Sequence, residues 1–175
     1  AGLATHYCPS AQTDALIAAL ECADLSGEDA LEVLLEEFSG DPGDSDLALT
    51  RTLIDAAFAG DSVEPMIERM TAAGDAWSTK QLKILAGKSP TALKLTLAAL
   101  RAGADLSFEG VMRQDLRLSA WCLTGQDFYE GVRAVIIDKD NAPVWSPATL
   151  AEVDDLAIAA AFAPLDDAHE MTFLD

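Results

Sequence analysis

Cysteine and histidine are scarce in this chain of 175 residues, and each shortage excludes a class of site. The three cysteines are odd in number, widely spaced and free of any CxxC motif, so neither a disulfide framework nor a zinc site is expected. We expect free thiols in a reducing compartment. Two histidines are too few for a His-rich metal centre, and the sequence has no GxSxG, HExxH, P-loop or GxGxxG motif. The residues alone therefore predict no catalytic residue and no metal ligand.

Basic residues are also few, since 11 Lys and Arg stand against 30 Asp and Glu, for a net charge of −19. A field this negative disfavours nucleic acid and anionic membranes as partners. Nine of the basic residues lie within residues 80–139, beside only six acidic ones. This stretch is where an anionic ligand could bind, although its Lys and Arg residues could equally serve as ion-pair partners of the surplus acids.

Long apolar runs are absent, which argues against a membrane-spanning segment, and the first residues lack the pattern of a signal peptide. Apolar residues nevertheless make up half the chain, with few aromatics among them. Such a composition, dominated by Ala and Leu, favours helices over sheets. Only the start of the chain, where Leu3, Thr5 and Tyr7 share one face, indicates a short strand.

Helix starts are clearest in the second half of the chain. Ser89-Pro90 predicts one, because Ser caps a helix and Pro is tolerated in the first turn. Asp127 and Glu130 have the spacing of a capping box, and Ser146-Pro147 predicts a short helix. The same reasoning predicts further helices over residues 14–25, 26–39, 44–58, 62–73, 75–86, 107–123 and 154–162.

One long motif resembles a known family. The segment DFYEGVRAVIIDKDNAPVW, residues 127–145, together with SPTALKLTLAALRAG from Ser89, is similar to the C-terminal region of 3-hydroxyisobutyryl-CoA hydrolases of the crotonase superfamily. The opening AGLATHY resembles the point where that family leaves its α/β core for a helical lobe. The resemblance implies a mainly α fold, with residues 1–8 as the end of the core and 9–175 as an all-helical C-terminal lobe.

The resemblance also implies a function for the parent enzyme, hydrolysis of an acyl-CoA thioester in valine breakdown. Its catalytic carboxylates and oxyanion-hole amides would lie upstream, so no catalytic residue is carried over to this chain. We expect the N-terminal core of the same protein and the acyl-CoA substrate as partners, with assembly of several copies left open. No cofactor is expected beyond the CoA moiety of the substrate. The expected location is the cytoplasm, or the mitochondrial matrix in a eukaryote.

One departure separates two branches of the superfamily. Enoyl-CoA hydratases resemble this stretch but usually carry a Phe and a Lys near CoA, where this chain has Val135 and Asp138, followed by Lys139. The difference favours the hydrolase branch. Lys139 is the first candidate for a CoA contact, followed by Lys94 and Arg133. Two alternatives stay open: the same lobe of an enoyl-CoA hydratase or isomerase, and a free-standing helical interaction module.

Overall fold

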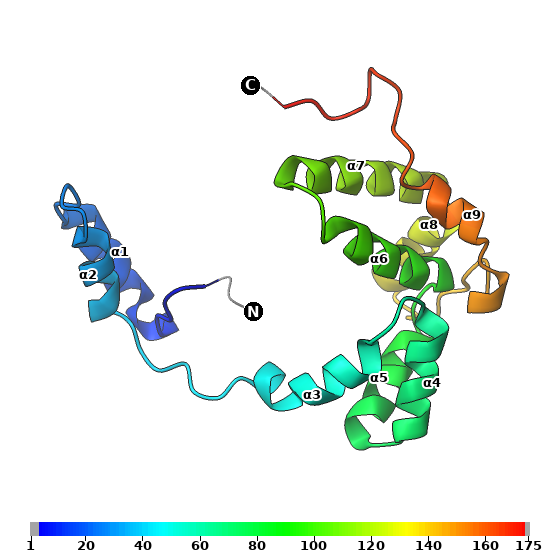
Figure 1. The fold of residues 1–175 in the computed structure, drawn as a ribbon, viewed down its shortest axis with the longest axis horizontal. Helices are drawn as coiled ribbons and strands as arrows, with labels where there is room; N and C mark the ends of the chain where they lie inside the picture. Colours follow the sequence, from blue (N-terminus) through cyan, green and yellow to red (C-terminus); the bar gives the residue numbers. More distant parts are fainter. Residues whose placement is uncertain (1–3, 174–175) are drawn as a thin grey trace. The chain divides into compact units, whose positions relative to one another are not determined.

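The computed structural model describes residues 4–173, which fold into helices and connecting segments (Figure 1). The chain divides at Arg51 into two compact units. Helix α3 (Asp46–Phe58) contains this division. Within residues 4–173 no helix is long and apolar enough to cross a membrane.

The first unit holds a short helical turn and two helices: η1 (Ser10–Gln12), α1 (Thr13–Cys22) and α2 (Ala30–Glu37). Neither α1 nor α2 has a fully buried residue. The Tyr7 carbonyl accepts a hydrogen bond from the Gly40 amide at 2.9 Å, and this bond links the start of the unit to the segment that follows α2.

The short strand predicted at the start of the chain is not found in its described part. Residues 4–8 are irregular, and none of residues 4–173 is in a strand. A strand needs a neighbour to complete its ladder of hydrogen bonds, and the described residues provide none. The first three residues of the predicted strand lie outside the described residues.

The second unit carries the remaining elements. They are α4 (Val63–Ala73), α5 (Ala76–Ala86), α6 (Pro90–Gly103), α7 (Phe108–Thr124), α8 (Gln126–Val132), the π-helical turn η2 (Arg133–Ile137), the 3-10 turn η3 (Leu150–Glu152) and α9 (Asp155–Ala160). The mainly helical fold class is confirmed.

Several predicted starts are confirmed by their caps. The Ser89 hydroxyl accepts the Ala92 amide at 3.0 Å, and the Ser107 hydroxyl accepts the Gly110 amide at 3.2 Å. Asp75 and Asp154 cap α5 and α9 in the same way. Each cap satisfies an amide that the first helical turn leaves without an intrahelical partner.

Two predicted starts are wrong. Residues 26–29 precede α2 instead of belonging to it, because the Ser26 amide bonds to the Asp24 side chain and turns the chain there. Ser146-Pro147 begins no helix, since the next turn, η3, starts after Thr149, which forms a capping box with Glu152.

Helix α6 lies between two apolar clusters of the second unit. Its Leu95 joins Val153, Ile158 and Ala161, with α7 packed alongside. Its Leu97 packs against the other cluster, which contains Met66 and the fully buried Met70. Figure 1 shows α6 and α7 side by side, with α4 and α5 near the start of α6. Burial on both sides makes α6 the central element of this unit.

Candidate functional site

Residues 127–145, the longest segment of the family resemblance, form one continuous feature. Helix α8 runs into η2, the chain turns through Lys139 and Asn141, and a return segment (residues 138–146) runs back beside α8. Both turn residues have positive φ, 56° and 53°. The Asn141 amide closes the turn on the Ala134 carbonyl at 3.0 Å. The motif is therefore a helix followed by a return segment that runs back along it.

The guanidinium group of Arg133 holds the return segment in place. Its Nη1 lies 2.8 Å from Asp138 and 2.7 Å from Asp140, and its Nε and Nη2 form a two-point bond to Glu130 at 2.9 and 2.8 Å. Nη2 also donates to the Ala142 carbonyl at 3.2 Å. A planar group with five N–H donors suits such a network better than an ammonium group would.

Glu130 and Asp127 face the return segment from one side of α8. Glu130 Oε1 accepts the Val144 amide at 2.7 Å, and Asp127 Oδ1 accepts the Ser146 amide at 2.9 Å. The predicted capping box between them is wrong, since Gly125 is the residue before α8 and makes no side-chain cap. Residues three apart on a helix lie on the same side, so the pair binds alternate amides of an extended segment instead.

The Glu130 carboxyl is strongly acidic as a result. The hydrogen bonds from Arg133 lower its pKa to about 2, with a further contribution from the Val144 amide. The pKa of the Asp140 carboxyl is lowered by Arg133 in the same way. Both carboxylates are ionised at neutral pH and paired with the Arg133 guanidinium group, so they have no proton to donate and little capacity to take one.

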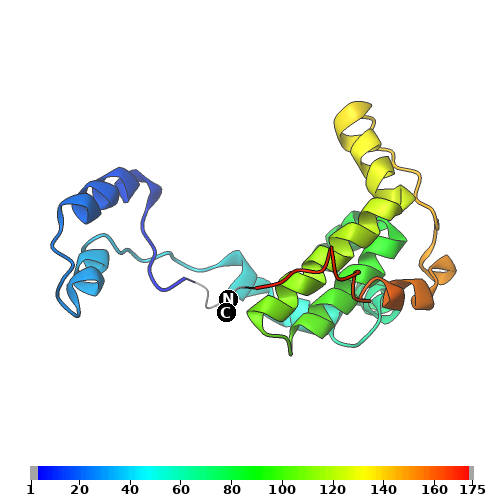
Figure 2. The ribbon, with the colours of Figure 1, turned by 90° about the horizontal axis from the view of Figure 1, so that it is seen from above.

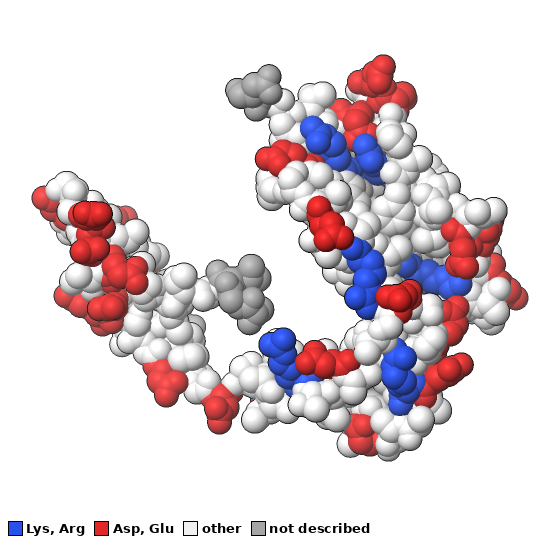
Figure 3. Space-filling view, in the orientation of Figure 1, with Lys and Arg blue, Asp and Glu red and all other residues white. Residues whose placement is uncertain are grey.

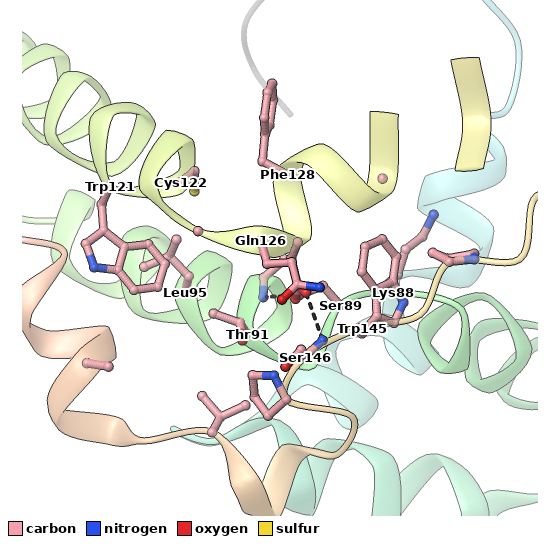
Figure 4. Close-up of a pocket in the computed structure, with 18 of the residues that line it drawn as sticks. Lys88, Ser89, Thr91, Leu95, Trp121, Cys122, Gln126, Phe128, Trp145 and Ser146 are labelled. Atoms are coloured by element: carbon pink, nitrogen blue, oxygen red, sulfur yellow. Dashed lines mark hydrogen bonds between the residues drawn. The ribbon is translucent and has the colours of Figure 1, made fainter. Parts of the chain in front are cut away.

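Asp127 also joins α8 to α6. Its Oδ2 accepts a hydrogen bond from the Ser89 hydroxyl at 2.5 Å, and Ser89 is only 5% exposed (Figure 4). The Trp145 indole donates to the Gly87 carbonyl at 3.3 Å and its ring lies against Gly131. Sequence reasoning missed this link. Its only signal is that the Ser-Pro start and the Asp of the motif both belong to the segments that carry the family resemblance.

An apolar pocket of about 810 Å³ opens beside this link. Trp121 and Leu95 lie on one side of it and Trp145 on the other, with Phe128 above (Figure 4). The Cys122 thiol also lines it, and burial raises the pKa of that thiol. Within residues 4–173 no three His, Cys, Asp or Glu side chains are placed to hold a metal ion. The lining is mainly apolar, with Lys88, Glu152 and Asp154 as charged residues beside Asp127, and it suits apolar contact with a ligand.

The three residues proposed for CoA lie in different settings. Lys94 contacts Asp155 at 3.0 Å and Glu64 at 3.2 Å, and its side chain is 16% exposed. Arg133 is held by three carboxylates, whereas Lys139 is exposed at the turn of the motif. In the second unit, Figure 3 shows several basic side chains beside acidic ones. The CoA contact stays a prediction for all three, with Lys139 the most accessible.

The comparisons with known proteins agree on one family. Residues 1–162 match the family described as enoyl-CoA hydratase/isomerase. The mitochondrial 3-hydroxyisobutyryl-CoA hydrolase of Gallus gallus is 46% identical over 112 residues, which are 64% of this chain and 29% of that protein. The 3-hydroxyisobutyryl-CoA hydrolase-like protein 5 of Arabidopsis thaliana is 37% identical over 175 residues, covering 95% of this chain and 45% of that protein.

Solved structures agree. A carnitinyl-CoA dehydratase from Mycobacterium thermoresistibile has a TM-score of 0.85 at 35% identity, covering 97% of this chain and 47% of that one. An enoyl-CoA hydratase from Rhodobacter sphaeroides has a TM-score of 0.83 at 30% identity, covering 99% and 48%. The chain thus spans less than half the length of these relatives. Because the family match covers nearly the whole sequence and the fold neighbours agree with it, the chain belongs to the enoyl-CoA hydratase/isomerase family of the crotonase superfamily.

Proposed function

We propose that this chain is the C-terminal helical lobe of an acyl-CoA thioester hydrolase acting on 3-hydroxyisobutyryl-CoA, with residues 9–175 as the lobe. One observation carries the proposal: curated relatives of that name match nearly the entire chain at more than a third identity, yet more than half of their length has no counterpart here. The lobe would cover the acyl-CoA site of an N-terminal core.

The reaction proposed for the whole protein is hydrolysis of the thioester. Water adds to the thioester carbonyl, and the tetrahedral intermediate breaks its C–S bond to release the CoA thiol and 3-hydroxyisobutyrate. Such a reaction needs a base for the water and donors for the oxyanion. Asp127 and Glu130 are both engaged in holding the return segment. We therefore propose neither of them as the base, and the family resemblance would place the catalytic carboxylates in the N-terminal core.

The lobe's own contribution would be binding. Lys139 is the first candidate for a contact with the CoA phosphates, because it is exposed at a fixed turn and a Lys ammonium group suits a phosphate. Lys94 and Arg133 rank behind it, because each would have to exchange a carboxylate partner for the phosphate. We also propose the mitochondrial matrix as the location in a eukaryote, in line with the relatives named as mitochondrial, and the cytoplasm otherwise.

A second candidate is the corresponding lobe of an enoyl-CoA hydratase or dehydratase, which the names of the two solved structures favour. The test uses the full-length protein with two substrates under the same conditions. Release of free CoA thiol from 3-hydroxyisobutyryl-CoA supports the hydrolase. Loss of the crotonyl-CoA double-bond absorbance, without thiol release from either substrate, would establish the hydratase instead.

A further inference from the structure

The backbone of the turn after η2 is unusual in two places. The π-helical turn is closed by the Asp138 amide, which donates to the Arg133 carbonyl at 2.8 Å. Lys139 then takes a left-handed φ of 56°, a conformation that costs a lysine energy and a glycine almost none. Single π-helical turns occur frequently at functional sites, and strained residues are retained where they position a functional group. Both features therefore indicate a role for the Lys139 side chain.

Lys139 is accessible and unpaired. Figure 2 shows α8 and η2, drawn in yellow, extending away from α6 and α7, and the turn with Lys139 follows their far end. The side chain is exposed, and among residues 4–173 it forms no ion pair, although Asp138 and Asp140 flank it. An ammonium group between two carboxylates is attracted to both of them. The two carboxylates are therefore held by another group.

Arg133 is the group that holds both carboxylates. Its Nη1 donates to Asp138 at 2.8 Å and to Asp140 at 2.7 Å. Its Nε and Nη2 donate to Glu130, and Nη2 also donates to the Ala142 carbonyl. A guanidinium group has five N–H donors, and these five bonds use all of them. Arg133 can therefore bind no phosphate without releasing a partner, whereas Lys139 can.

Removing the guanidinium group would change the charge that a ligand meets at this turn. Asp138, Lys139 and Asp140 together carry one net negative charge, which Arg133 cancels. Without it, either aspartate could pair with the ammonium group, and both would repel an anionic ligand. Glu130 is bound inside the motif, where its side chain is only 15% exposed. The attraction of Lys139 for an anion thus depends on Arg133.

We infer that Arg133 is a positioning residue for substrate binding: by holding the two aspartates, it leaves the Lys139 ammonium group free for the phosphates of the CoA nucleotide. This inference rests on the proposed contact between Lys139 and CoA. It gives Arg133 an indirect role in place of a contact of its own. A lysine could not replace Arg133, because an ammonium group lacks the planar fork that binds Glu130 at two points and still reaches both aspartates.

Calorimetric titration of the full-length protein with CoA tests the inference, because binding is measured without turnover. Arg133→Gln removes the guanidinium group. Arg117→Gln is the matched control, since Arg117 is also bound to a carboxylate, that of Glu170 at 3.0 Å, but lies on α7 outside the turn. A rescue variant combines Arg133→Gln with Asp138→Asn and Asp140→Asn, so that the carboxylates that would pair with the ammonium group are absent.

Arg133→Gln should weaken CoA binding at least about tenfold, the loss expected when a charged hydrogen bond is given up, and Arg117→Gln should leave it unchanged. The rescue variant should recover most of the affinity, which a purely structural role of Arg133 would not allow. In a Lys139→Gln background, Arg133→Gln should have little further effect, because the group that it positions is already absent.

Unchanged CoA affinity in the folded Arg133→Gln variant, or no recovery in the rescue variant, would overturn the inference. Absence of CoA binding by the unsubstituted protein would do the same. If circular dichroism shows that Arg133→Gln does not fold, Arg133→Lys takes its place with the same rescue. Thiol release from 3-hydroxyisobutyryl-CoA is measured separately, so a protein that binds CoA without hydrolysing the thioester refutes the proposed function and leaves this inference tested.

Discussion

Replacing Ser89 by Ala should destabilise the fold more than the loss of a serine hydroxyl usually does. The hydroxyl makes two bonds: it caps α6 through the Ala92 amide, and it donates to Asp127 across 38 residues of sequence. Loss of a helix cap costs about 1 kcal/mol. Loss of a hydrogen bond to a carboxylate costs about 1.5–3 kcal/mol. Because Ser89 is 5% exposed, water cannot easily replace either bond, and we expect a loss of about 3 kcal/mol in the free energy of unfolding.

Ser107→Ala is the matched control for this prediction. Ser107 caps α7 through the Gly110 amide, but it is exposed, and among the described residues its hydroxyl bonds only within its own helical turn. Its loss should cost about 1 kcal/mol, so the two variants should differ by about 2 kcal/mol. At the m-values typical of urea unfolding, that difference shifts the midpoint by about 1 M.

Tryptophan fluorescence is a suitable assay, since all three tryptophans lie in the second unit and Trp145 bonds to Gly87 close to Ser89. If Ser89→Ala and Ser107→Ala lose the same stability, the link between α6 and α8 contributes nothing. The description of the motif as a helix fastened to its neighbours would then be refuted.

Two further predictions concern the same motif. Because its folded-state pKa is lowered to about 2 from near 4.5, Glu130 contributes stability that is complete above about pH 4.5 and is lost as the pH falls toward 2. Urea midpoints of Glu130→Gln should therefore vary less over this range than those of the unsubstituted chain, and an identical slope would contradict the pairing with Arg133. Gly131→Ala should be tolerated or stabilising by up to about 1 kcal/mol, since the new Cβ would lie 3.5 Å from the Trp145 ring and Ala favours helices. A red-shifted Trp145 emission in that variant would show that the ring had been displaced.

The sequence predicted elements whose signals are local. Ser89, Ser107 and Asp75 cap the helices that follow them, because a cap is a bond between residues three apart and needs no knowledge of the rest of the chain. Gly74, directly after α4, has the left-handed φ of 61° that favours glycine at a helix end, which is likewise a local signal.

The motif shows where local reasoning ends. An Asp and a Glu three residues apart have the spacing of a capping box, yet the same spacing places both on one side of a helix, where a distant segment can bind them. The bonds from Ser146 and Ser89 to Asp127 span 19 and 38 residues. Nothing in the spacing of the sequence distinguishes the two arrangements, because the deciding partner is brought in by the tertiary fold. The apolar pocket was missed for the same reason, as it is formed by residues from α6, α7, α8 and α9.

The resemblance predicted the family correctly, whereas the contacts with CoA proposed for three basic residues remain predictions. Lys94 and Arg133 are basic in sequence, but the fold pairs both with carboxylates that the sequence places up to 61 residues away. In a chain this acidic, a basic residue is more readily matched by an acid than left for a ligand. Lys139 remains the most accessible of the three.

The central claim is that this chain is a lobe whose parent performs the chemistry elsewhere. The most direct test compares the full-length protein with the 175-residue chain alone in one thiol-release assay, with 3-hydroxyisobutyryl-CoA as substrate and equal molar amounts of each. We predict that the full-length protein releases CoA thiol at an enzymatic rate and that the 175-residue chain gives only the background rate. Thiol release by the chain alone at a rate comparable to that of the full-length protein would contradict the account.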